Sequence, residues 1–205
     1  MLRDIIVKNR SFRRFDTSYT ICKDTLVRLV DLARLSPSAA NKQPLKYFLS
    51  YRSNVNDLVF PCLRWAAYLK EWAGPAIAER PTAYIVILGD KDVSTNYWCD
   101  HGIAAQSILL GAVEQGLGGC IIGSIDRVAL RAALGVPERY EVLLVIALGK
   151  PQETVIIDSA NKGESIEYWR DEKNIHHVPK RRLEDIIIPK FNVHGEKILL
   201  NDDCR

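Results

Sequence analysis

The stretch DHGIAAQSILLGAVEQGLGGCIIG, residues 100–123, decides the layered architecture of this chain. Apolar side chains recur through its first part at helical spacing, which predicts a long helix over 100–115 that Gly116 ends. CIIG (120–123) then predicts a buried strand. Two other continuous apolar runs, AYIVIL (83–88) and EVLLVIAL (141–148), predict buried strands as well. Strands separated by helices indicate a sheet with helices on both faces.

Shorter elements follow from the same patterns. Helices are expected at 2–9, 24–35 and 126–134, a strand at 46–51, and one or two short helices within 56–74.

Beyond Pro151 the continuous and periodic apolar runs become weaker. The polar residues 158–178 predict a connection over a surface. EDIII (184–188) predicts a strand with no partner nearby in the sequence, so we expect it to pair with another subunit.

Composition excludes several classes of protein. Of 205 residues, 47% are hydrophobic and 26% charged, which is ordinary for a globular domain and argues against disorder, collagen or coiled coil. A formal net charge of +3 is too small to indicate nucleic acid. No apolar run approaches the roughly 20 residues that cross a bilayer. Five scattered cysteines without a CxxC, and histidines outside ligand spacing, predict neither a disulfide framework nor a metal site.

These features predict one domain, or at most a lobed one, over 1–188, followed by an extension at 189–205 whose role stays open. We expect a soluble, cytoplasmic protein with reduced cysteines and with neither nucleic acid nor membrane as a partner.

Two segments near the start of the chain could bind a ligand. NRSFRRF (9–15) offers guanidinium groups and a hydroxyl that suit a phosphate, although a solvated basic turn has the same composition. SPSAANKQP (36–44) combines small side chains, two amides and two prolines. Such a loop can approach a flat ligand closely, and it can also be an ordinary helix-to-strand connection.

Two later segments add to them. In GLGGCIIG (116–123) the glycines follow a helix and open a strand, the reverse of a dinucleotide fingerprint, so a classical NAD site is rejected. The glycines leave room for a ligand's flat face, or they form a helix cap and tight turn. VPKRRLEDII (178–187) is a second basic cluster, which either meets the first on one phosphate or stays a solvated face. Asp100 fits a helix N-cap at least as well as a catalytic group.

Taken in order, the segments resemble the flavin-dependent nitroreductase family over roughly residues 2–188. The matching motifs are RSFRRF (10–15), PSAANKQP (37–44), DHGIAAQSILLGA (100–112), GLGGCIIG (116–123), ALGVP (133–137), ALGKP (147–151) and PKRRL (179–183). The resemblance implies an α+β, three-layer fold with a central, mostly antiparallel or mixed sheet flanked by helices. It also implies an intertwined homodimer that binds FMN non-covalently at two shared sites.

The resemblance assigns cofactor-binding residues one by one. Arg10, Ser11 and Arg13 match positions at the FMN phosphate and ribityl chain, and Lys180 and Arg182 match a terminal basic pair at the same phosphate.

The other assignments concern the flavin ring. The loop that reaches the flavin from the second subunit is matched by Pro37, Ser38, Ala39, Asn41 and Gln43. Gly118 and Gly119 match the turn behind the ring.

The implied activity is hydride transfer from NAD(P)H, through flavin N5, to a small organic acceptor such as a nitroaromatic or a quinone. No residue stands out as a general acid, so the catalytic residues stay unassigned. Leu45 stands where many relatives have tryptophan, which puts the acceptor's identity in doubt. Alternatives are a specific reductive dehalogenation, oxidation of a heterocycle, or a flavin-binding protein with little turnover.

Overall fold

The main sheet is built around β5 (Tyr140–Pro151), the longest strand of the computed structural model, which describes residues 1–188. The other strands of this sheet are β1 (Phe15–Asp16), β2 (Leu45–Ser50), β3 (Ala83–Asp90) and β4 (Gly118–Ile122). Their order is β1-β5-β3-β2, with β4 also paired to β5, and every strand pairing is antiparallel. The expected mostly antiparallel sheet is therefore confirmed.

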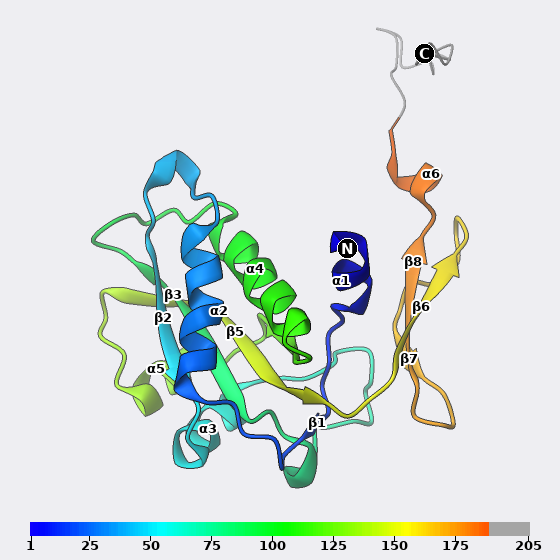
Figure 1. Cartoon of the computed structure of the whole chain (residues 1–205), viewed down its shortest axis with the longest axis horizontal. Coiled ribbons are helices and arrows are strands. Elements are labelled where there is room, and N and C mark those ends of the chain that lie inside the picture. Colours follow the sequence, from blue (N-terminus) through cyan, green and yellow to red (C-terminus); the bar gives the residue numbers. More distant parts are fainter. Residues whose placement is uncertain (189–205) are drawn as a thin grey trace, which may run out of the picture. The chain divides into compact units, whose positions relative to one another are not determined.

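Helices cover both faces of this sheet. They are α1 (Leu2–Lys8), α2 (Lys23–Leu35), α3 (Ser53–Val59), α4 (Asp100–Glu114) and α5 (Arg127–Leu134), with 3-10 turns η1 (Ala39–Asn41), η2 (Phe60–Cys62) and η3 (Ile77–Glu79). Successive strand residues face opposite sides. Ile85 and Ile87 of β3 share a core with α2 and α4, which lie side by side in Figure 1. Tyr84 and Val86 share a second core with α3 and α5, which confirms the three layers.

One expected helical region is only partly helical. Helix α3 and the turn η2 account for residues 53–62, but the chain from 63 to 74 forms no helix. Leu63 instead pairs with Ile125, and Arg64 N donates to the carbonyl of Ser124 at 3.0 Å. These long-range hydrogen bonds replace the i→i−4 bonds that would continue a helix.

The chain divides into two compact units, Met1–Glu153 and a second that begins at Thr154. A lobed domain can contain two such units, so the single domain over 1–188 stays a prediction, and its extension at 189–205 lies outside the described residues. None of the helices within residues 1–188 is long and apolar enough to cross a membrane.

The second unit corrects two expectations. Residues 158–178 are more than a surface connection, because β6 (Val155–Ala160), β7 (Trp169–Arg170) and β8 (His176–Arg181) form a sheet. Strands β6 and β8 are parallel and therefore need the long connection that looked structureless.

The predicted strand at 184–188 is wrong over its first part, where the structure has the short helix α6 (Leu183–Ile186). Glu184 and Asp185 lie in the first turn of α6, where acidic side chains favour a helix start.

Candidate flavin site

The arginine-rich segment lies against the glycine-rich strand. Ser11 forms a parallel bridge with Gly119, and Phe12 N donates to the carbonyl of Gly119 at 3.0 Å. The first and third segments singled out in the sequence are therefore in contact.

Arg10 has an unused donor. Its side chain is half-buried, and Nη2 donates to the carbonyl of Ile6 at 2.8 Å. Its Nε is buried and has no hydrogen-bond partner within residues 1–188. Burial lowers the pKa of this guanidinium, which still remains charged at neutral pH. A buried cationic donor without an acceptor is the feature expected where an anion binds.

Arg13 is more deeply buried than Arg10, and its backbone is held by Glu153. Its side chain is 8% exposed, and Nη1 donates to the carbonyl of Ser11 at 3.1 Å. The carboxylate of Glu153 accepts from the backbone N–H groups of both Arg13 and Arg14. Because Glu153 follows β5 closely, these bonds hold the arginine segment to the end of the central strand.

Gly118 and Gly119 lie in β4 and not in the expected turn. The turn precedes them, at Gly116, whose φ of +71° ends the helical segment. Both positions are tightly packed: a β-carbon at Gly118 would meet the Phe12 ring, and one at Gly119 would run into the carbonyl oxygen of Ala147. Close packing against the Phe12 ring and against β5 therefore accounts for these two glycines. Their contact with a flavin stays a prediction.

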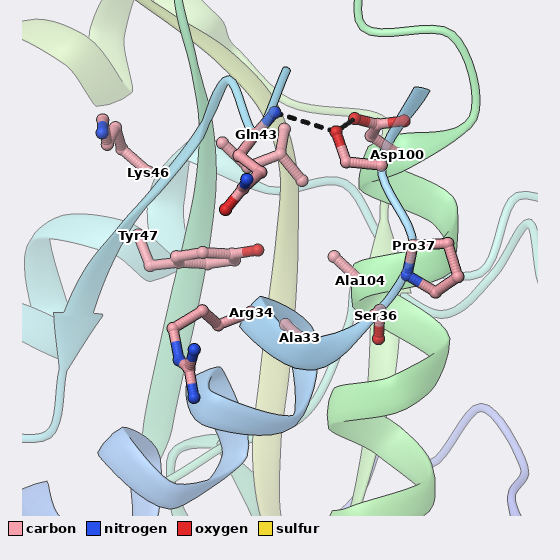
Figure 2. Close-up of a pocket in the computed structure, with 11 residues that line it drawn as sticks. Ala33, Arg34, Ser36, Pro37, Gln43, Lys46, Tyr47, Asp100 and Ala104 are labelled. Atoms are coloured by element: carbon pink, nitrogen blue, oxygen red, sulfur yellow. Dashed lines mark hydrogen bonds between the residues drawn. The ribbon is translucent and has the colours of Figure 1, made fainter. Parts of the chain in front are cut away.

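The loop PSAANKQP is anchored by Asp100 at the start of α4 (Figure 2). Asp100 is 4% exposed and accepts from Ser38 Oγ at 2.6 Å and from Ala39 N at 2.9 Å. Ser38 Oγ in turn accepts from Gln43 N at 2.9 Å. The interpretation of Asp100 as an N-cap is therefore wrong, because Cys99 is the N-cap and the carboxylate holds the loop.

Replacing Asp100 with asparagine is expected to lower the free energy of unfolding by about 1.5–3 kcal/mol, the usual contribution of a hydrogen bond to a charged group. The amide NH₂ cannot accept from Ser38 or Ala39, so one of the two bonds is lost. Urea unfolding measures the change. Asp24→Asn, at an exposed site in the first turn of α2, is the matched control, and equal effects of the two substitutions would contradict the anchoring role.

The tip of this loop has an unusual backbone. Ala40, Asn41 and Gln43 have φ values of +49°, +52° and +52°, in the left-handed region that side chains with a β-carbon seldom occupy. Gln43 Nε2 donates to Asn41 Oδ1 at 3.0 Å, so the two exposed amides face each other. Strained backbone of this kind is concentrated at functional sites, which is consistent with a ligand-binding loop.

A cavity of about 220 Å³ lies under the loop, between α2, β2 and the start of α4. Figure 2 shows the Tyr47 ring extending into it. Burial, and then the charge of Asp100, raise the pKa of Tyr47 to about 12, so its hydroxyl stays protonated at neutral pH. Tyr47 was not among the residues predicted from the sequence. Its place on alternate positions with Leu45 and Leu49, which also pack on the core beside α2 and α4, was a usable signal.

The second basic cluster lies in the second unit. Lys180 is exposed on β8, and Arg182 precedes α6 and forms an ion pair with Glu184. The structure describes the two units separately, so the meeting of Lys180 and Arg182 with Arg10 at one phosphate stays a prediction.

The loop and the arginine segment contact different parts of α4. Ser38 is bound at Asp100, whereas Gly119, which bridges to Ser11, packs against Leu109. Nine residues of helix separate these two points by about 13 Å along the axis, at 1.5 Å per residue. Within residues 1–153, the structure therefore brings together the first and third segments, and it holds the loop further along the helix.

The chain is similar to known proteins over most of its length. The family model described as "Nitroreductase family" matches residues 6–150. An Archaeoglobus fulgidus protein, provisionally named NADH dehydrogenase/NAD(P)H nitroreductase, is 27% identical over 157 residues, which cover 73% of this chain and 84% of that protein.

Solved structures agree with the family match. An FMN-dependent nitroreductase from Clostridium difficile R20291 superimposes with a TM-score of 0.61 at 25% identity, covering 73% of this chain and 87% of the other. A nitroreductase from Exiguobacterium sibiricum 255-15, solved in complex with FMN, has a TM-score of 0.62 at 17% identity, covering 75% and 89%. The second likeness concerns the fold alone.

Proposed function

The chain belongs to the nitroreductase family, and from that premise we propose that it is an FMN-dependent oxidoreductase that passes hydride from NAD(P)H to a small organic acceptor. The provisional name of the Archaeoglobus relative includes NAD(P)H nitroreductase, and the two solved structures described above are of an FMN-dependent protein and of an FMN complex. The oxidoreductase class is the part of the prediction that the family match supports directly.

The observation that carries the proposal is the unpartnered Nε of Arg10, beside Ser11 and the bridge to Gly119. A flavin phosphate carries nearly two negative charges and takes charge-assisted hydrogen bonds from several cations. In the proposed site, the phosphate and ribityl chain are held by Arg10, Ser11, Arg13, Lys180 and Arg182.

When bound, FMN would supply the hydride-accepting N5 that protein side chains lack. The chain's own contribution is to bind and orient the ring. The proposed ring contacts come from Gly118 and Gly119 and, in a second copy of the chain, from Pro37, Ser38, Ala39, Asn41 and Gln43.

Two observations support a homodimer. The loop anchor and the arginine segment are about 13 Å apart along α4, so a second copy is a simple way to bring a loop to each phosphate site. Several large apolar side chains are also exposed on α1 and α2, namely Leu2, Ile6, Val7, Val27 and Leu35. Monomeric proteins seldom expose large apolar patches.

Residues 186–188 also support a homodimer. Ile186, Ile187 and Ile188 are 58%, 62% and 80% exposed, although three consecutive isoleucines are costly to leave in water. We propose that a second copy covers them, as expected for subunits that exchange their C-terminal segments.

One experiment tests the cofactor, the activity and the dimer. Purified protein should be yellow, and NADH or NADPH should bleach its flavin absorbance in anaerobic stopped-flow. Light scattering across a dilution series should show a dimer that loses FMN only as it dissociates. Protein that gains no flavin spectrum when FMN is added would contradict the cofactor. A stable monomer that keeps FMN would contradict the shared site.

The same samples separate the alternatives. Bound FMN that both nucleotides reduce only very slowly would indicate a flavin-binding protein. Turnover confined to halogenated phenols, with none on nitroaromatics or quinones, would indicate a specific dehalogenation.

A further inference from the structure

A second cavity, of about 230 Å³, lies where the start of β3 meets the turn between β2 and α3. At roughly 30 Å³ per molecule its volume equals about eight waters. Its lining includes two charged residues, two tyrosines, a phenylalanine and a threonine: Asp57, Arg80, Tyr51, Tyr84, Phe60 and Thr82. None of its lining residues belongs to the proposed flavin site, so the inference goes beyond the proposed function.

Two buried polar atoms of this cavity lack a hydrogen-bond partner within residues 1–188. These two atoms are Thr82 Oγ1 and Arg80 Nε. The side chain of Tyr84, which also lines the cavity, is 1% exposed. Buried polar groups are satisfied in the large majority of cases, because leaving one unpaired costs about 1–3 kcal/mol. Two such atoms on residues two apart in the chain, both lining one cavity, indicate that something other than the chain supplies their hydrogen bonds.

The charged groups of Arg80 and Asp57 lie near the Tyr84 hydroxyl. Burial raises the pKa of Tyr84, while Arg80 lowers it and Asp57 raises it, so both charges act on the hydroxyl. Because the Tyr84 hydroxyl stays protonated, it can donate one hydrogen bond and accept others.

The charges in the cavity balance. Arg80 Nη1 is 4.0 Å from Asp57 Oδ1, at the outer limit of an ion pair, and its guanidinium stacks 3.8 Å above the ring of Phe60. One carboxylate and one guanidinium leave no net charge to attract an ion. The carboxylate accepts, the guanidinium donates, and the hydroxyls of Thr82 and Tyr84 do both, which matches a ligand made of hydroxyl groups. The rings of Tyr51 and Phe60 add apolar surface for its carbon skeleton.

We propose that this cavity binds a small neutral polyol of about monosaccharide size, whose hydroxyls pair with Asp57, Arg80, Thr82 and Tyr84. An anionic ligand would gain from Arg80 but would meet the carboxylate of Asp57 next to it. Neutral sugars are therefore preferred to sugar acids of the same size.

The test uses the full-length protein and three probes: glucose, ribose and the sugar acid gluconate. Ligand-observed NMR should show that at least one of the neutral sugars binds, with a millimolar dissociation constant, and that gluconate binds more weakly. Tyr84→Phe and Thr82→Val, which remove one hydroxyl each without changing the side chain's shape much, should each weaken binding about fivefold. Tyr47→Phe, in the other cavity, is the matched control and should leave the affinity unchanged.

Thr82→Val removes a buried hydroxyl that has no partner within residues 1–188, so it should not lower the urea midpoint, and the midpoint of Tyr84→Phe is measured beside it so that a loss of binding is not attributed to unfolding. The proposal is overturned if no neutral sugar binds at tens of millimolar, if gluconate binds more tightly, or if neither variant changes the affinity. The first of these results would leave ordered water as the occupant.

Discussion

Replacing Arg10 with alanine is expected to weaken FMN binding about tenfold to a hundredfold, the effect of losing charge-assisted hydrogen bonds of about 1.5–3 kcal/mol. Within residues 1–188, the only hydrogen bond of this side chain joins Nη2 to the Ile6 carbonyl, so folding should change little. Arg182→Ala should weaken binding by a similar factor if the second basic cluster reaches the same phosphate.

Flavin fluorescence titration of the apo-protein measures both affinities. Arg28→Ala, on α2, is the control, because Arg28 is exposed, hydrogen-bonds only locally to Thr25, and is outside the proposed site. Unchanged affinity in both variants would rule out the two-cluster phosphate site. A loss in Arg10→Ala alone would keep the first cluster and reject the second.

Replacing Gly119 with alanine is expected to lower the free energy of unfolding by about 3 kcal/mol, the upper part of the usual range for overpacking. The added methyl group would run into the carbonyl oxygen of Ala147 and the side chain of Leu109, so β4 would have to move away from β5. A backbone carbonyl that is paired in a sheet cannot give way as a flexible side chain can.

Urea unfolding gives the magnitude. Gly102→Ala is the matched control, because Gly102 lies in α4 with open space around its missing β-carbon, and alanine there should be neutral or stabilising by up to about 1 kcal/mol. Equal stability of the two variants would show that β4 tolerates a side chain at 119, contrary to the packing described above.

The sequence was most informative where apolar residues are continuous or periodic. AYIVIL and EVLLVIAL predicted the two central strands, and the apolar stripe of residues 100–115 predicted α4 to within one residue. These elements are buried by their own composition, so local pattern and tertiary structure agree.

The failures lie where long-range pairing decides the structure. Leu63 pairs with Ile125, and β6 pairs in parallel with β8 some twenty residues later, and neither partner can be recognised from a local window. EDIII has the composition of a strand, yet its acidic residues are placed at the start of a short helix.

At the candidate site, residue types were easier to predict than roles. The sequence singled out Asp100 but assigned it to the wrong partner, because its bonds to Ser38 and Ala39 span about sixty residues. It singled out Gly119 for contact with a ligand, which stays a prediction, but it did not foresee the tight packing of Gly119 against Ala147.

The central position of β5 predicts which backbone amides exchange slowly with solvent. Ala147 is paired with Tyr84 of β3 on one side and with Cys120 of β4 on the other, so its amide is expected to be among the slowest in the protein to exchange with deuterium. At the other extreme, β1 joins the same strand through only two residue pairs, Phe15 with Pro151 and Asp16 with Lys150. The arginine segment leads directly into β1. The hydrogen bonds of Phe12 with Gly119 and of Glu153 with Arg13 and Arg14 add to these two pairs, so the amides at the cationic end of the proposed site should exchange more slowly than those of an isolated two-residue strand.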